Sequence, residues 1–179
     1  MKYVVAAVGA LVLIFFGCQY VGERIDQKEQ ALCVDNFYKN VIALDVRGAP
    51  SKDEIEILSP FISTKLRDSL LQASVAEEKH ALDMKGDEVP LFEGPMFVGG
   101  GEGASRIKAI NREVMTGQIT FLVTLQMMNS HDKDPNNDWK DRAILIQDKG
   151  KWVVDDLVFL IKEGNVNNRT LSQSFLPKY

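Results

Sequence analysis

The chain has 179 residues, of which 45% are hydrophobic and 26% charged, and its formal net charge at pH 7 is −4. This composition is ordinary for a globular protein and supplies enough apolar residues for one sizeable core. Lysines and arginines alternate with acidic residues and form no basic stripe. A nucleic-acid partner is therefore not expected, because phosphate binding needs clustered cations.

The first residues have the pattern of an export signal. Met1 and Lys2 form a short cationic segment, and residues 3–16 are a continuous apolar run. A run of about 14 residues is shorter than the roughly 20 that a transmembrane helix needs, and it is typical of a secretory signal. We therefore predict that residues 1–17 are a signal peptide that delivers the chain to the cell envelope.

Cys18 follows this run directly after Gly17. The pair resembles the processing site of bacterial lipoproteins, which implies a thioether-linked diacylglycerol on Cys18, cleavage before it and acylation of the new N-terminus, for example by palmitate. Several acyl chains give stable membrane attachment. Gln19 stands where an aspartate would favour the inner membrane, so the expected location is the outer membrane, facing the periplasm.

Two other interpretations of this segment stay open, because Phe15 and Phe16 depart from the usual lipoprotein pattern. One is an uncleaved membrane anchor from Tyr3 to Gly22, and the other is simple secretion. Cleavage before Cys18 would remove the charge of Lys2 and leave a net charge of −5. Cys33, the only other cysteine, lies in a helical pattern and is predicted to be a buried small apolar residue.

Two helices are predicted after the signal. Residues 18–28 are expected to form a tether into a single domain that spans 29–179, with a first helix from about Asp26 to Asp45. That helix has an apolar face and ends at Gly48-Ala49-Pro50. The second helix is expected to start near Ser59-Pro60 or Ser63. The apolar faces of the two helices comprise Val34, Phe37, Tyr38, Val41 and Ile42, and then Leu58, Ile62, Leu66, Leu70 and Val75.

The second half of the chain predicts an antiparallel sheet. Residues 85–105 contain prolines and the run Gly99-Gly100-Gly101-Glu102-Gly103, which marks a loop but lacks the lysine of a nucleotide-binding loop. Alternating apolar residues then predict strands over 105–115, 118–128, 139–147 and 151–161, the last two joined in a hairpin. Helices followed by such a meander predict an α+β domain with helices packed on one face of a curved sheet.

The polar residues of the last two strands show no catalytic constellation. Asp155 and Asp156 are adjacent on a strand, so their side chains should point to opposite faces, and one of them is expected to cap a turn or to meet Arg142 or Lys151 across the hairpin. Asp138, Trp139, Asp141 and Arg142 cluster at a strand start, where Trp139 could pack against Trp152 across the hairpin. Neither His80 nor His131 has a neighbour at metal-ligand spacing, so no metal or cofactor is predicted.

Three short stretches carry a resemblance to a known family: Asn36-Phe37-Tyr38, residues 58–66, and the hairpin from Trp139 to Asp156. They resemble an uncharacterised bacterial family in the cone-shaped, cystatin-like superfamily typified by nuclear transport factor two, which includes envelope lipoproteins of enterobacteria. The resemblance implies a strongly bent sheet around helices, with a cavity at the wide end. The residues expected to contact that cavity or a partner are Tyr38, Trp139, Arg142, Trp152, Asp155 and Asp156.

The sequence therefore predicts a non-enzymatic envelope lipoprotein. Its cone-like domain would dock a protein partner or a small ligand near the membrane, as an accessory subunit of an envelope complex. One alternative is a periplasmic immunity protein that neutralises a secreted toxin. The other is an enzyme that uses the cone cavity, which would require a histidine or carboxylate from the sheet to meet another in a closed pocket. The predicted strands contain no histidine, and Asp155 or Asp156 facing Arg142 in a roomy pocket would favour this alternative.

Overall fold

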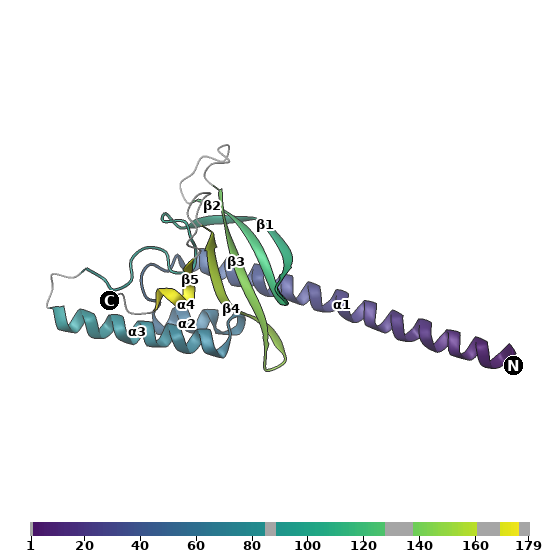
Figure 1. Ribbon diagram of the computed structural model, residues 1–179. Coiled ribbons are helices and arrows are strands. Elements are labelled where there is room, and N and C mark those ends of the chain that lie inside the picture. The colour runs from purple at the N-terminus through teal and green to yellow at the C-terminus, as the bar shows by residue number, and fades with distance from the viewer. Residues whose placement is uncertain (1, 85–88, 128–137, 161–168, 176–179) are drawn as a thin grey trace.

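The computed structural model describes residues 2–84, 89–127, 138–160 and 169–175, and their side chains from Glu23 onward, Met84 excepted. Helices come first and an antiparallel sheet follows (Figure 1). The elements are α1 (Lys2–Leu44), α2 (Lys52–Leu58), the 3-10 helix η1 (Ser59–Phe61), α3 (Thr64–Met84), β1 (Ala104–Met115), β2 (Gln118–Met127), β3 (Asp138–Asp148), β4 (Lys151–Leu160), β5 (Arg169–Thr170) and α4 (Leu171–Ser174).

Helix α1 is longer than the sequence predicted. It runs without a break from Lys2 to Leu44 and projects from the domain as a rod (Figure 1), so the predicted start near Asp26 is wrong. The polar residues between Glu23 and Glu29 include glutamate, lysine, arginine and glutamine, which all have high helix propensity. They carry the helix across the segment that the sequence assigned to a tether.

The buried face of α1 agrees with the predicted helical face. Val34, Phe37, Tyr38 and Val41 are buried in the core, and Ile42 packs against it. The helix ends at Leu44, next to the predicted end at about Asp45, because Asp45 takes a left-handed conformation with φ of 43°. The Asp45 N–H then donates to the Val41 carbonyl and closes the last turn.

A short helix, α2, precedes the predicted second helix. Ser51 caps it with a reciprocal pair of hydrogen bonds: its Oγ accepts from the Glu54 N–H, and the Glu54 carboxylate accepts from the Ser51 N–H. The longer helix α3 then starts after Ser63, whose Oγ accepts from the Leu66 N–H. The predicted apolar face is buried at Leu58, Ile62, Leu66 and Leu70, but Val75 is exposed.

The five strands form one antiparallel sheet in the order β1-β2-β3-β4-β5, which confirms the α+β class. Both long hairpins, β1–β2 and β3–β4, have two-residue turns, at Thr116-Gly117 and Lys149-Gly150, with positive φ at both positions. Such turns match the twist of the strands and fix their register. Phe121, Val123 and Leu125 of β2 lie buried on one face, as the alternation predicted. Strand β5 was not predicted.

A β-bulge at Asp155 divides strand β4. Ile144 pairs with Asp156 and the next residue, Leu145, pairs with Val154, so Asp155 is left over between them. The bulge reverses the alternation of the strand, and both Val154 and Leu157 are therefore buried in the core. The predicted face of alternate residues from Trp152 to Leu160 is wrong beyond Val154 for this reason.

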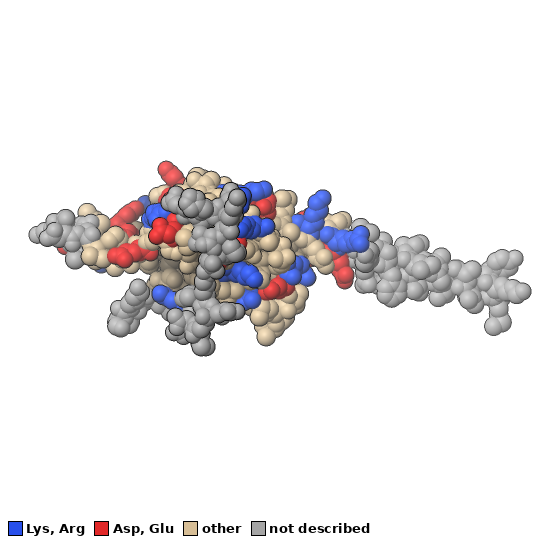
Figure 2. Space-filling model, turned by 90° about the horizontal axis from the view of Figure 1, so that it is seen from above, with Lys and Arg blue, Asp and Glu red and all other residues tan. Residues whose placement is uncertain are grey.

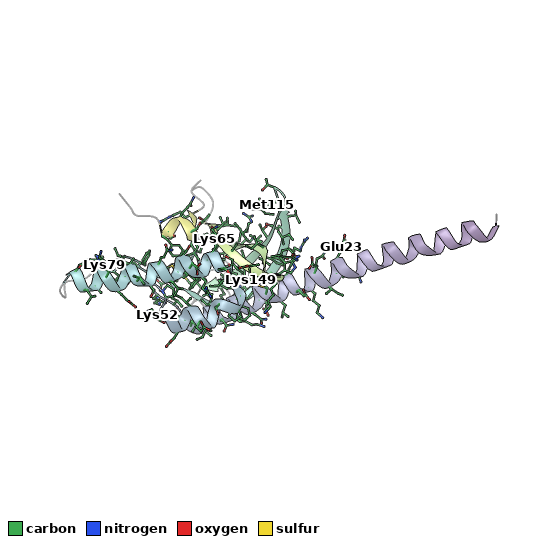
Figure 3. All side chains as sticks on the ribbon, turned by 90° about the horizontal axis from the view of Figure 1, so that it is seen from below. Glu23, Lys52, Lys65, Lys79, Met115 and Lys149 are labelled. Atoms are coloured by element: carbon green, nitrogen blue, oxygen red, sulfur yellow. The ribbon has the colours of Figure 1, made fainter. Side chains whose placement is uncertain are left out.

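Two polar contacts fix α1 to the sheet where the helix leaves the domain. The Trp152 indole Nε1–H donates to Asp26 Oδ1 at 2.7 Å, and Arg112 Nε donates to Gln30 Oε1 at 2.8 Å. Helix α1 contacts both β1 and β4. Met115 and Lys149, next to or in the two hairpin turns, lie toward the end of the domain from which Glu23 and the rest of α1 project (Figure 3).

Replacement of Asp26 tests this attachment. Asp26→Ala should lower the free energy of unfolding by about 1–2 kcal/mol, because the half-buried indole N–H of Trp152 loses its acceptor. Asp35→Ala is the matched control on the same helix, since it removes an exposed pair with Lys39 that is worth less than about 0.5 kcal/mol. Urea denaturation measures both variants, and equal losses would contradict the attachment.

Candidate functional site

The predicted cavity residues do not gather at one place. Tyr38 of α1 and Trp139 of β3 both interact with the carboxyl group of Asp141, on β3. Arg142, Trp152, Asp155 and Asp156 make their contacts elsewhere. The structure therefore points to the surroundings of Asp141, a residue that sequence reasoning grouped with its neighbours but did not select as a site residue.

Asp155 and Asp156 hold separate parts of the fold together, and the prediction that they do not converge is confirmed. Asp155 accepts from Ser63 Oγ at 2.6 Å and from Lys65 Nζ at 3.4 Å, at the start of α3. Asp156 accepts from the backbone N–H and the hydroxyl of Ser172, in α4. Each carboxylate is thus engaged at the end of a helix.

Arg142 does not meet either of these aspartates. Its guanidinium pairs with Glu113 of β1, with an N–O distance of 3.2 Å. The expected contact with Asp155 or Asp156 is therefore wrong, and so is the expected contact between Lys151 and either of them, because their carboxylates accept from the serines and from Lys65. The bulge at Asp155 explains part of this, since it turns that side chain toward α3.

The two tryptophans are also apart. Trp139 lies opposite Leu125 near the start of β3, whereas Trp152 lies opposite Gln147, beside the β3–β4 turn. Since residues in a strand are about 3.3 Å apart, the length of the hairpin separates them and the predicted packing pair is wrong. Trp152 holds α1 through Asp26, and Trp139 donates its indole N–H to Asp141.

Asp141 is a buried carboxyl group in the middle of the sheet. It lies between Val123 of β2 and Phe159 of β4, and its exposed fraction is 0%. Its Oδ2 accepts from the Gly99 N–H at 3.0 Å and from Trp139 Nε1 at 3.2 Å. Its Oδ1 has no hydrogen-bond partner among the described residues. Burial raises the pKa of Asp141 to about 7, although the two hydrogen bonds act in the opposite direction.

Tyr38 brings a second polar group into this interior. The side chain is fully buried, and its hydroxyl has no hydrogen-bond partner in the part of the chain that the structure describes. Burial raises the pKa of the Tyr38 hydroxyl well above its usual value, and the negative charge of Asp141 adds to the effect. Buried polar atoms without partners cost about 1–3 kcal/mol each, so two of them whose charges influence each other call for an explanation.

The backbone of Gly99 packs directly against Asp141, and the backbone of Gly100 packs directly against Trp139. A Cβ on Gly99 would lie 2.7 Å from Asp141 Oδ1, and a Cβ on Gly100 would lie 2.7–2.8 Å from three atoms of the Trp139 ring. Any larger residue would clash at these distances, so glycine is needed for close approach. The glycine run was predicted as a loop, but nothing in its spacing connects it to Asp141.

A cavity of about 260 Å³ adjoins Gly99. Gly99 belongs to the cavity wall and also contacts Asp141, so its backbone separates the cavity from the buried carboxyl group. Most of the wall is apolar, and two oppositely charged residues complete it. The lining residues are Leu91, Phe92, Glu93, Pro95, Met96, Val98, Gly99, Phe159, Arg169 and Ser174.

Of the two cysteines, Cys18 lies within α1 at a position whose side chain is not described, so its lipidation stays a prediction. Cys33 is a free, half-buried thiol whose Sγ lies 3.8 Å from the Phe61 carbonyl. Burial raises the pKa of the Cys33 thiol to about 11, which disfavours the reactive thiolate. Cys33 thus packs against the core as a small residue, in line with the prediction.

Comparison of the chain with protein-family models, with curated proteins and with solved structures found no match. The resemblance to the superfamily of nuclear transport factor two therefore stays a prediction. Among the residues whose side chains the structure describes, from Glu23 onward, no helix combines the length and the apolar character of a membrane span. The same residues contain no group of three or more histidine, cysteine and acidic side chains that could hold a metal ion.

The burial of Asp141 predicts how stability depends on pH. Its pKa is about 7 in the folded chain against 3.8 for an ordinary aspartate, so the folded state binds an extra proton between these values. The free energy of unfolding should therefore fall as pH rises from 4 through 7, by up to the order of 4 kcal/mol from this group.

Asp141→Asn has the same shape and no charge, and it should remove this dependence. Denaturation of both proteins between pH 5 and 8 measures the effect. The variant should gain stability relative to the parent as pH rises. A difference between the two proteins that stays constant over this range would contradict the role of Asp141.

Proposed function

We propose that this chain is a non-enzymatic protein of the cell envelope, held at a membrane by its N-terminus. Cys18 carries the lipid, and the outer membrane is the proposed site of attachment. The domain, which we take to be cone-like, docks a protein partner or a small ligand close to the membrane, as an accessory subunit of an envelope complex. The pattern that carries the proposal is Lys2, the apolar run 3–16 and the Gly17-Cys18 pair.

The continuity of α1 supports this arrangement. The helix that fills the core is the same helix that contains Cys18, so no flexible segment separates the attachment point from the domain. An α-helix rises 1.5 Å per residue, which places Cys18 roughly 12 Å along the axis from Asp26, where the helix contacts the sheet through Trp152. The uncleaved anchor from Tyr3 to Gly22 would use the same helix.

The charge distribution is in keeping with a membrane on the α1 side. In Figure 2, lysines and arginines gather mainly near the end of the domain from which α1 projects, and acidic residues gather mainly at the opposite end. The exposed part of α1 itself carries both signs, with Arg24 and Lys28 beside Glu23 and Glu29. Basic side chains near an anionic lipid surface are attracted to it, and the acidic end would then point away.

The edge of the sheet offers a surface for a protein partner. Strand β1 is the first strand in the sheet order, and no strand pairs with its outer side among the described residues. A groove of about 510 Å³ runs beside it, lined by Asp35, Lys39 and Ile42 of α1 and by residues 105–110 of β1. An extended segment of a partner could add to such an edge through main-chain hydrogen bonds.

Asp155, Asp156 and Arg142 have structural partners, which favours docking over catalysis at these residues. Asp155 and Asp156 accept hydrogen bonds at helix ends, and Arg142 pairs with Glu113. The observation that would have favoured an enzyme, one of these carboxylates facing Arg142 in a roomy pocket, is replaced by these pairs.

Mass spectrometry of the mature N-terminus tests the attachment. The protein isolated from membranes should begin at an acylated Cys18, and Cys18→Ala should release it from the membrane fraction, because the acyl chains are lost. Cys33→Ala is the control, since it changes the other cysteine and should leave the lipid and the location intact. An N-terminal peptide that begins with unmodified Met1 would overturn the lipid attachment and favour the uncleaved anchor.

Affinity isolation tests the docking. The lipidated protein should enrich one defined membrane complex, and the Cys18→Ala variant should enrich it less, because the domain is no longer held beside it. A photocrosslinking residue at Ser105, in the groove, should capture a subunit of that complex, whereas one at Leu82, on the exposed end of α3, should not. Equal capture at both positions would exclude the β1 edge as the docking surface.

A further inference from the structure

We propose that the cavity beside Gly99 binds a small primary amine with an apolar body, and that the buried carboxylate of Asp141 receives the ammonium group. This inference rests on the proposed function, since it names the chemical class of the small ligand that the domain would dock. It combines two observations that are independent of each other: an apolar cavity and an unpaired buried carboxylate oxygen on the other side of a glycine.

The cavity suits the apolar body of such a ligand. Its volume of about 260 Å³ is close to the lower end of the range for small-molecule sites. Phe92 and Phe159 contribute aromatic surface, and Met96 and Val98 contribute aliphatic surface. Transfer of an alkyl or aryl group from water to this wall is favourable in proportion to the apolar surface that it buries.

The position of Asp141 suits the ammonium head. Oδ2 is engaged by Gly99 and Trp139, whereas Oδ1 is free of hydrogen bonds among the described residues and lies directly beneath Gly99. Gly99 and Phe159, which both line the cavity, lie between this oxygen and the cavity. The proposal therefore requires the Gly99 backbone to move aside so that the head can reach Oδ1, and Gly101, two residues further along, has no neighbour within 4 Å of a built Cβ that would oppose such a movement.

The groups around Oδ1 favour a cation over a neutral or anionic head. An ammonium group has three donors, one of which Asp141 Oδ1 can accept, and the Trp139 ring, whose indole N–H donates to the same carboxyl group, favours positive charge. An alcohol would leave the buried carboxylate uncompensated, and a carboxylate would repel it.

Arg169 and Glu93 also line the cavity, but they do not reverse this preference. Both are exposed and carry opposite charges, so water and salt screen them. Asp141 is fully buried, and a charge in the interior acts much more strongly at the same distance.

Binding of the amine should be linked to the proton on Asp141. The groups that face Asp141 are Tyr38 from α1, Val123 from β2, Phe159 from β4 and Gly99 from the loop, and none of them titrates near neutral pH. Because the ammonium group pairs with the ionised carboxylate, affinity should rise about tenfold from pH 6 to pH 8 as Asp141 loses its proton. Below pH 7, each bound amine should release a proton from the protein.

Titration calorimetry on the full-length protein tests the inference with three probes of one shape: 2-phenylethylamine, 2-phenylethanol and 3-phenylpropionate. The amine should bind at least tenfold more tightly than the alcohol at pH 8, and the carboxylate more weakly than either. Asp141→Asn should reduce the affinity for the amine to that for the alcohol, because it removes the charge and keeps the shape. Titrations at pH 6 in buffers of different ionisation heat should show the released proton.

Arg169→Gln is the control on the cavity wall, and it should leave the preference for the amine unchanged. Tightest binding of the carboxylate, with loss in Arg169→Gln, would instead assign the head group to Arg169 and overturn the proposal. Absence of amine binding, or amine binding that is indifferent to Asp141→Asn, would also overturn it. None of these outcomes bears on the membrane attachment, which the Cys18 experiment tests separately.

Discussion

The packing of one face of α1 against the sheet organises the rest of this molecule. Val34, Phe37, Tyr38 and Val41 are all buried, and the Phe37 ring meets that of Phe97 edge-on at 6.1 Å. Through this contact the helix holds the segment of Met96, Phe97 and Val98, which continues directly into the glycine loop. The same helical face carries the Tyr38 hydroxyl into the interior beside Asp141. The core and the candidate site therefore depend on the same helix.

Periodic apolar residues predicted the regular strands and helices. They did not predict the elements in which the period is interrupted or is too short to detect. The strands were predicted because apolar residues recur at every second position. The face of α1 was predicted because they recur at every third or fourth position. The bulge at Asp155 was missed, because one extra residue leaves alternation intact on each side of it. Helix α2 was missed, because seven residues contain too few apolar positions to show a period, although Ser51 and Glu54 form a capping box that could have revealed it.

The candidate site could be predicted only in part. Tyr38 and Trp139 were selected, through a family resemblance and as a possible pocket wall, and they do interact with one carboxyl group. Asp141 itself had a signal in the sequence: alternation places it on the same side of its strand as Trp139, Ala143 and Leu145, and a carboxylate among core residues is unusual. Its contact with Gly99 lies 42 residues away along the chain, and no local pattern reports such a distance.

The unbroken course of α1 has a mechanical consequence. A flexible linker would fix only how far a domain can travel from its attachment point, whereas a helix also fixes which way the domain faces. With the N-terminal part of this helix held at a membrane, the β1 edge would keep one tilt relative to the lipid surface. A partner in the same membrane would then meet that edge after lateral diffusion and rotation about the membrane normal, without a search over tilt.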